Sequence, residues 1–121
     1  MIEDKKIIDI PEALNRAMGD IDFLKKMIAE LRRTIPNFVV RIQQAIDDAD
    51  LETLAKESHQ FKGAAANLGA KDLARAALKL EQIGKSGSIE GVTEAFAQLE
   101  KSTAAFNQFL VQMDWSSIST R

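Results

Sequence analysis

Hydrophobic residues recur along this chain at helical spacing. In the clearest stretch, Phe23, Leu24, Met27, Ile28 and Leu31 follow an i, i+1, i+4, i+5, i+8 pattern, which places them on one side of a helix. Similar periods occur in several other stretches, whereas the alternation of apolar and polar residues that marks a strand is nearly absent. The chain is therefore predicted to be all-α.

The breaks in this pattern predict where the helices begin and end. Aspartates precede three helical stretches as candidate N-caps, and Gly19 and Gly69 are candidate stops. The residues at 84–88, Gly-Lys-Ser-Gly-Ser, have the composition of a turn. Five helices are expected, over about 9–18, 20–47, 51–66, 70–83 and 89–113.

Pro36 lies inside the second of these helices. Proline removes a helical hydrogen bond, so this stretch is either one long kinked helix or two helices that meet at 34–36. The apolar residues stay in phase from Ile28 to Ile46 across the proline, which favours a single kinked helix.

Short connections between amphipathic helices predict antiparallel neighbours in a bundle. The 121 residues contain no internal repeat or linker, so one domain is expected, with its core at about 8–113 and a frayed tail at 114–121. No apolar run approaches the ~20 residues that cross a bilayer, and the charged N-terminal stretch does not resemble a signal peptide. We expect a cytoplasmic domain without membrane contact.

Composition excludes several kinds of site. Lys and Arg number 16 against 18 Asp and Glu, a balance that argues against non-specific nucleic-acid binding. Without cysteine there can be no disulfide, thiolate zinc site or cysteine nucleophile, and a single histidine excludes a two-histidine metal site. We therefore expect no bound metal or cofactor.

The one histidine lies in the most informative segment, Ser58 to Gly69. Helical geometry places His59, Lys62 and Gly63 on one side of the helix, away from its apolar stripe. Glycine inside a helix costs on the order of 1 kcal/mol against alanine, which suggests that Gly63 provides space beside the imidazole. A neutral imidazole is a nucleophile and the Lys62 ammonium attracts anions, so together they suit a phosphoryl group.

Each of these residues also has an ordinary explanation. A lone surface histidine usually has no function, a helix lysine is usually solvated, and a helix glycine can mark close packing between helices. The case for a site depends on the three together.

The segment H-Q-F-K-G-A-A-A-N-L-G-A, followed by Leu73 and then Leu80-Glu81, resembles the histidine-containing phosphotransfer (HPt) domain. The similarity extends from about Ile8 to Leu110. It implies an antiparallel four-helix bundle with a short additional N-terminal helix. By this resemblance His59 Nε2 exchanges a phosphoryl group with the aspartate of a response-regulator receiver domain.

The resemblance also implies roles for the neighbouring residues. Lys62 would stabilise the phosphoryl oxygens, Gly63 would leave room for the partner, and Glu81 would orient the imidazole through Nδ1. The expected receiver contacts are Gln60, Ala64, Asn67, Met18 and Ile21. Ile10 and Leu14 are further candidates for an exposed apolar patch.

Two residues depart from the family pattern. Phe61 replaces the usual leucine, and Gln60 stands where several members carry an apolar residue. The first change should only repack the core, whereas the second leaves the identity of the partner open.

No glycine-rich nucleotide loop occurs in the sequence, so we expect a phosphoryl carrier and not an autonomous enzyme. The receiver would supply Mg²⁺. The expected partners are a receiver domain and a hybrid sensor histidine kinase, with the domain itself a monomer.

Three other interpretations compete with the relay. An HPt-like adaptor that works without phosphorylation would tolerate His59→Gln. In the dimerisation domain of a histidine kinase, an acidic residue and an Arg-Thr-Pro sequence typically follow the histidine, whereas Gln60 to Gly63 follow it here. A small RNA-binding bundle is disfavoured by the acidic charge balance.

Overall fold

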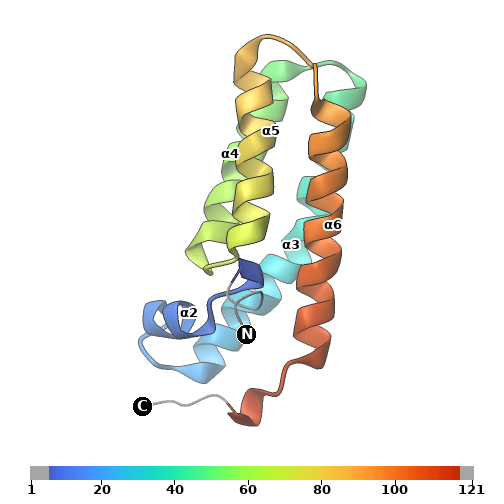
Figure 1. Ribbon diagram of the computed structural model, residues 1–121. Helices are drawn as coiled ribbons and strands as arrows, with labels where there is room; N and C mark the ends of the chain where they lie inside the picture. The colour runs from blue at the N-terminus through green and yellow to red at the C-terminus, as the bar shows by residue number, and fades with distance from the viewer. Residues whose placement is uncertain (1–5, 118–121) are drawn as a thin grey trace.

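The computed structural model describes residues 6–117, which fold as an all-α bundle (Figure 1). Its helices are α2 (Ile10–Arg16), α3 (Ile21–Asp47), α4 (Leu51–Asn67), α5 (Lys71–Ser86) and α6 (Val92–Gln112), followed by the 3₁₀ turn η1 (Trp115–Ser117). The four long helices run antiparallel to their neighbours in sequence, and the short α2 lies beside the α4–α5 turn (Figure 1). The predicted fold class is confirmed.

The predicted aspartate caps begin the first three helices. The side chains of Asp9, Asp20 and Asp50 each accept a hydrogen bond from the backbone N–H three residues later, at 3.2, 3.1 and 3.1 Å. These bonds satisfy N–H groups that have no partner within the helix. The local sequence therefore determines where α2, α3 and α4 start.

Pro36 lies inside one continuous helix of 27 residues. On both sides of the proline, α3 buries the same stripe, with Ile28 and Leu31 before it and Ile42 after it. The phase argument for one helix is confirmed, since tertiary burial on both sides of Pro36 compensates for the hydrogen bond that proline removes.

The turn expected at 84–88 begins later than predicted. The helix α5 continues through Gly84 to Ser86, and Gly87, at φ 82°, ends it. A Cβ added at Gly84 would lie 2.7 Å from the backbone nitrogen of Ala55, so this glycine allows α4 and α5 to approach closely. Composition alone does not separate a turn glycine from a packing glycine.

The last long helix also begins later than predicted, at Val92 and not at Ile89. Gly91 precedes it at φ 81°, a left-handed conformation that a helix interior does not accept. The apolar Ile89 extended the helical pattern, but it lies outside the helix and is 38% exposed.

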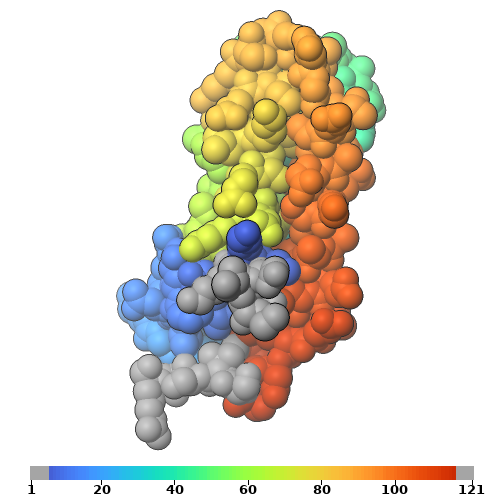
Figure 2. Space-filling view, viewed as in Figure 1, coloured from blue at the N-terminus to red at the C-terminus, as the bar shows by residue number. Residues whose placement is uncertain are grey.

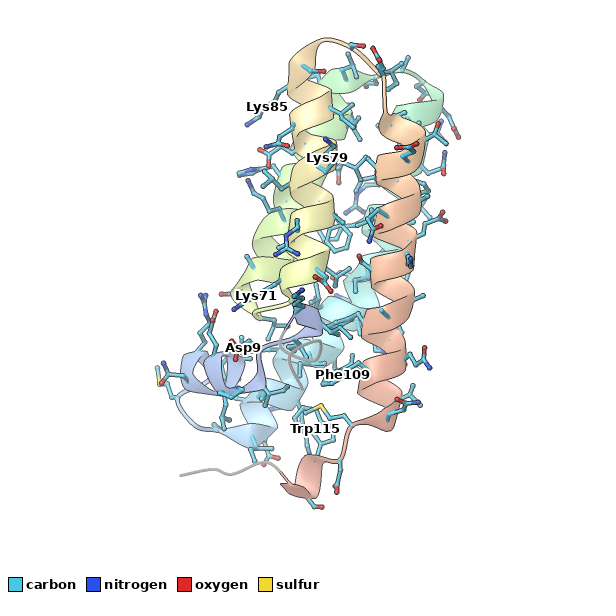
Figure 3. All side chains as sticks on the ribbon, in the orientation of Figure 1. Asp9, Lys71, Lys79, Lys85, Phe109 and Trp115 are labelled. Atoms are coloured by element: carbon cyan, nitrogen blue, oxygen red, sulfur yellow. The ribbon has the colours of Figure 1, made fainter. Side chains whose placement is uncertain are left out.

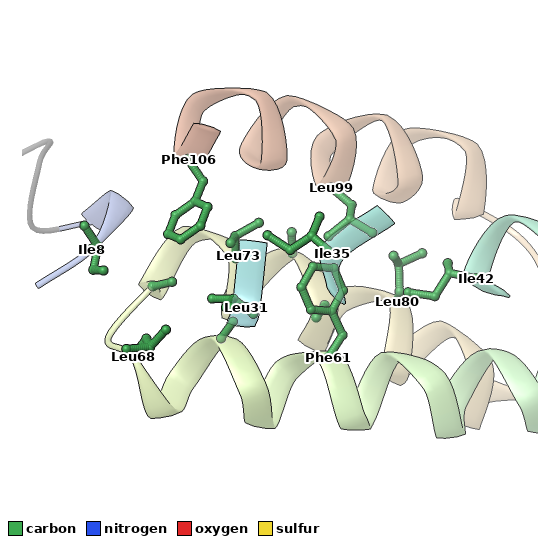
Figure 4. Packing of buried hydrophobic residues seen from close by; sticks show 14 of the residues in the cluster. Ile8, Leu31, Ile35, Ile42, Phe61, Leu68, Leu73, Leu80, Leu99 and Phe106 are labelled. Carbon is green, nitrogen blue, oxygen red and sulfur yellow. The ribbon is translucent and has the colours of Figure 1, made fainter. Parts of the chain in front are cut away.

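Aromatic and aliphatic side chains fill the centre of the bundle. Phe61 of α4 is fully buried and stacks on Phe38 of α3, with ring centroids 5.0 Å apart. Leu80 of α5 and Leu99 of α6 join the same core (Figure 4). Burying a side chain of this size stabilises a fold by roughly 1.5–3 kcal/mol, so the shared core holds the four helices at fixed rotations.

The start of α2 is attached to the α4–α5 turn. The backbone N–H of Asp9 donates to the Gly69 carbonyl at 3.0 Å, and the Asp9 carboxylate lies 3.4 Å from Lys71 Nζ (Figure 3). Gly69 adopts φ +67°, as its predicted turn role requires. The short helix is thereby held at this end of the bundle.

The apolar patch expected near α2 is smaller than predicted. Ile10 and Leu14 are half-buried because α2 uses them to pack on the bundle. Ile21, the first residue of α3, is also half-buried, whereas Met18 is 94% exposed. In the expected tail, Trp115 begins the 3₁₀ turn η1, and residues 118–121 lie outside the described part of the chain. None of the described helices is long and apolar enough to span a membrane.

In the upper part of the face seen in Figure 2, α5 and α6 lie side by side, and the blue N-terminal region lies below α5. The helix α4 packs most extensively against α5. That interface carries the histidine.

Candidate functional site

The packing of α4 determines the direction of His59. The helix buries Leu54, Ser58, Phe61 and Ala65 in the core, so the residue after Ser58 projects from the bundle. The His59 side chain is 65% exposed. The prediction of a surface imidazole is therefore confirmed.

A carboxylate from α5 contacts this imidazole. Oε2 of Glu81 lies 2.9 Å from Nδ1 of His59, and the Glu81 side chain is only 3% exposed. An ionised carboxylate only accepts hydrogen bonds, so Nδ1 carries the proton in this contact. The other ring nitrogen, Nε2, then keeps its lone pair on the exposed imidazole.

Two lysines neutralise the same carboxylate. Lys62 Nζ lies 2.6 Å from Glu81 Oε1, and Lys85 Nζ lies 2.9 Å from Oε2. These two ammonium groups, and to a smaller extent His59, lower the pKa of Glu81 from 4.5 to about 2 although burial acts to raise it. Glu81 is therefore ionised at neutral pH and remains a hydrogen-bond acceptor for Nδ1.

Gly63 has open space beside it. A Cβ added at this position would meet no heavy atom within 4 Å, and the residue is exposed. Close helix packing therefore does not explain this glycine, and Gly84 has that role instead. The gap beside His59 is available to an approaching molecule.

The structure thus brings together three predicted residues, His59, Lys62 and Glu81. Lys62 contacts Glu81, where the resemblance implied only a contact with phosphoryl oxygens. The sequence interpretation missed Lys85. Its i+4 spacing from Glu81 was the available signal, because residues four apart are neighbours on a helix.

An apolar groove runs between α3 and α4 next to this site, with a volume of about 490 Å³. Phe23, Met27 and Phe38 line it from α3, and the predicted contact residues Ala64 and Asn67 line it from α4. Phe23 is 49% exposed, which is unusual for so large an apolar side chain.

The other expected contact residues lie elsewhere. Gln60 is exposed and follows His59 on α4, outside the lining of the groove. Met18, in the turn between α2 and α3, and the half-buried Ile21 do not line it either. Phe23 and Met27 were not predicted to line a groove, because they belong to an apolar stripe that was attributed to core packing.

Comparison with protein-family models gives a match to the Hpt domain over residues 21–109, most of the chain. The chain belongs to the Hpt domain family. Hpt domains serve phosphotransfer in two-component phosphorelays, and the predicted family and function are confirmed at this level. The match includes the whole histidine segment.

A solved structure supports the fold of this Hpt domain. The crystal structure of the HPT domain from a sensor hybrid histidine kinase of Shewanella superposes with a TM-score of 0.70. It is 23% identical in sequence, and the alignment covers 91% of this chain and 98% of that one. A search of curated proteins gave no match.

Proposed function

We propose that Nε2 of His59 is the phosphoacceptor of this Hpt domain and exchanges its phosphoryl group with the aspartate of a response-regulator receiver domain. The observation that carries this proposal is the contact between Glu81 and Nδ1, 2.9 Å long, on an imidazole that is otherwise exposed. It supports a single tautomer, with the nucleophilic lone pair on the accessible nitrogen.

The proposed transfer needs no proton to move. The Nε2 lone pair forms the N–P bond while the P–O bond of the receiver's aspartyl phosphate breaks, and the electron pair leaves on the aspartate carboxylate. The imidazole then carries a positive charge, with the proton still on Nδ1. The ionised Glu81 stabilises this charge at hydrogen-bond distance.

Lys62 and Lys85 are proposed to stabilise the transferred group. Both ammonium groups form ion pairs with Glu81, which contacts His59. They are therefore near the imidazole, and their side chains can turn toward a phosphoryl group on Nε2. Charge neutralisation and alignment are the main protein contributions to phosphoryl transfer. We propose that Mg²⁺ is held by the receiver.

The receiver is proposed to dock over Gly63 and the groove between α3 and α4. The open space at Gly63 admits its active-site loops, and the groove offers exposed apolar surface next to the histidine. All of these residues belong to one chain, so we propose that the domain acts as a monomer, alone or within a hybrid kinase.

The test is phosphoryl transfer from receiver domains that carry labelled aspartyl phosphate. The wild-type domain should take up label that is acid-labile and alkali-stable, as expected for phosphohistidine, and His59→Gln should take up none. Circular dichroism should show both proteins equally helical. Label on the His59→Gln variant, or no label on the wild type from any receiver, would contradict the proposal.

A further inference from the structure

A second groove lies on the opposite side of α3 from the α4 groove, where α3 meets the C-terminal end of α6. Its volume is about 460 Å³. Trp115, just beyond the end of α6 (Figure 3), is one of the residues that line it. The lining side chains that matter here are Lys25, Ile28, Arg32, Arg33, Leu110 and Trp115.

The rim of this groove is basic, although the chain as a whole has a net charge of −2. Three of the residues that line it, Lys25, Arg32 and Arg33, are basic, and none of the lining residues is acidic. Arg33 pairs with Glu30, which lies on the α4 side of the same helix. Within the described part of the chain, neither Lys25 nor Arg32 forms an ion pair, so two cations at the rim have no neutralising carboxylate.

The floor of the groove is apolar. Ile28 is buried, and Leu110 and Trp115 are half-buried. Lys25 Nζ lies 5.3 Å from the centre of the Trp115 ring, a cation–π distance that holds the ammonium group over the indole. An apolar floor with unpaired cations above it suits a ligand that combines an apolar side chain with negative charge.

We propose that this groove binds an acidic segment of a partner protein, anchored by an apolar side chain against Trp115 and Leu110. Charge complementarity with Lys25 and Arg32 favours such a segment. A hollow with two exposed cations at its rim suits a narrow peptide better than nucleic acid, whose binding depends on many phosphate contacts. It also suits a peptide better than a membrane, which requires an extended basic surface.

The groove is separate from the phosphotransfer site. Lys25, Ile28 and Arg32 face α6, whereas Phe23, Met27 and Phe38 line the groove on the α4 side of the same helix. An acidic segment could therefore stay bound while a receiver occupies the histidine face. The proposal does not depend on the phosphotransfer proposal.

Trp115 provides a direct measurement. It is the only tryptophan in a chain without tyrosine, so its fluorescence reports on this groove alone. A short synthetic peptide of Asp, Glu, Leu and Phe should change the emission of Trp115 saturably, with one peptide per chain. Binding should weaken as salt is added, because exposed charges are screened. A peptide with Lys in place of each acid should not bind.

Charge-reversal variants test whether the acidic peptide binds at this groove. The double variant Lys25→Glu, Arg32→Glu should bind the acidic peptide about tenfold more weakly or worse. The matched control Lys101→Glu reverses an exposed charge on α6 outside the groove lining and should bind as the wild type does. The milder variant Arg32→Gln should weaken binding in the same direction, in case the double variant is unstable. His59→Gln should bind normally.

Three results would overturn the proposal. The first is no saturable response to the acidic peptide. The second is equal binding by the Arg32→Gln variant and the wild type. The third is a Trp115 response to phosphatidylserine vesicles or to an oligonucleotide that exceeds the response to the peptide.

Discussion

Glu81 on α5 lies with Oε2 2.9 Å from Nδ1 of His59 on α4, so the imidazole is oriented by a residue 22 positions away in sequence. The carboxylate itself is buried and is held by Lys62 and Lys85. The three contacts form one network: the lysines keep Glu81 ionised, and Glu81 keeps the proton on Nδ1.

Removing the acceptor on Nδ1 should slow phosphoryl uptake. We expect Glu81→Ala to reduce the rate about ten- to a hundredfold, by analogy with the loss when residues that orient metal-binding histidines are removed. Glu81→Gln should lose less, because its amide oxygen can still accept from Nδ1. Nitrogen NMR of His59 should show the Nδ1–H tautomer in the wild type and a mixture in Glu81→Ala. Equal rates in all three proteins would contradict the orienting role.

The depressed pKa of Glu81 predicts that acid weakens the fold. Its pKa is about 2 when folded, against an ordinary 4.5, so the unfolded chain binds more protons between these values. The stabilising contribution is complete above about pH 4.5 and is lost as pH falls toward 2. Urea unfolding should show the wild type losing stability over this range more steeply than Glu81→Gln. Parallel pH profiles would contradict the ionised, ion-paired state.

Two helix glycines should respond to alanine in opposite ways. Gly63→Ala should raise the free energy of unfolding by about 0.5–1 kcal/mol, since the methyl group enters open space and alanine favours a helix. Gly84→Ala should lower it by about 1–3 kcal/mol, because the Cβ would lie 2.7 Å from the Ala55 nitrogen. Both are measured by chemical unfolding.

Space at Gly63 should matter for transfer. A larger side chain, in Gly63→Leu, should slow phosphoryl exchange about tenfold or more while leaving the fold intact, since small displacements of reacting groups are costly. An unchanged transfer rate would show that the receiver does not approach over this position.

The two lysines should contribute to transfer in proportion to their burial. Lys62 is 29% exposed and Lys85 is 67% exposed, so water screens Lys85 more. We expect Lys62→Ala to slow phosphoryl uptake about tenfold and Lys85→Ala to have a smaller effect. Lys79→Ala, which removes an exposed lysine from α5 outside the network, should leave the rate unchanged. A loss with Lys79→Ala as large as with Lys62→Ala would indicate a general charge effect.

Phe61 should stabilise the fold without taking part in transfer. Phe61→Leu removes the stacked contact with Phe38 and leaves a small void, at a cost of about 1–2 kcal/mol in the free energy of unfolding. Phosphoryl uptake at 20 °C should persist, because the rotation of α4 depends on several other buried side chains. Loss of uptake in a folded Phe61→Leu protein would show that the stack positions His59.

Local features of the sequence predicted the helices well. The aspartate caps mark where α2, α3 and α4 begin, because a cap acts on backbone groups within one turn. The apolar period across Pro36 predicted one helix, which α3 is. The two boundary errors, at Gly84 and Ile89, arose where a residue's role depends on what packs against it: Ala55 lies against Gly84, and Gly91 prevents the helix from including Ile89.

The residues of the site also divide into those predicted from local sequence and those that depend on packing between helices. The period of α4 alone placed His59, Lys62 and Gly63 on an exposed side, since positions i, i+3 and i+4 share a face of a regular α-helix. Glu81 entered through the family resemblance and not through any local pattern, and Lys85 was not predicted.

By itself, therefore, the sequence determined the helices, their buried stripes and the exposed histidine, all of which depend on contacts within a turn or two. Only the tertiary structure decided that Glu81 contacts Nδ1, that Gly84 and not Gly63 is the packing glycine, and that two grooves flank α3. These features join residues of different helices. Their distances depend on how each helix is rotated and shifted along its neighbour, which the packing of the whole core determines.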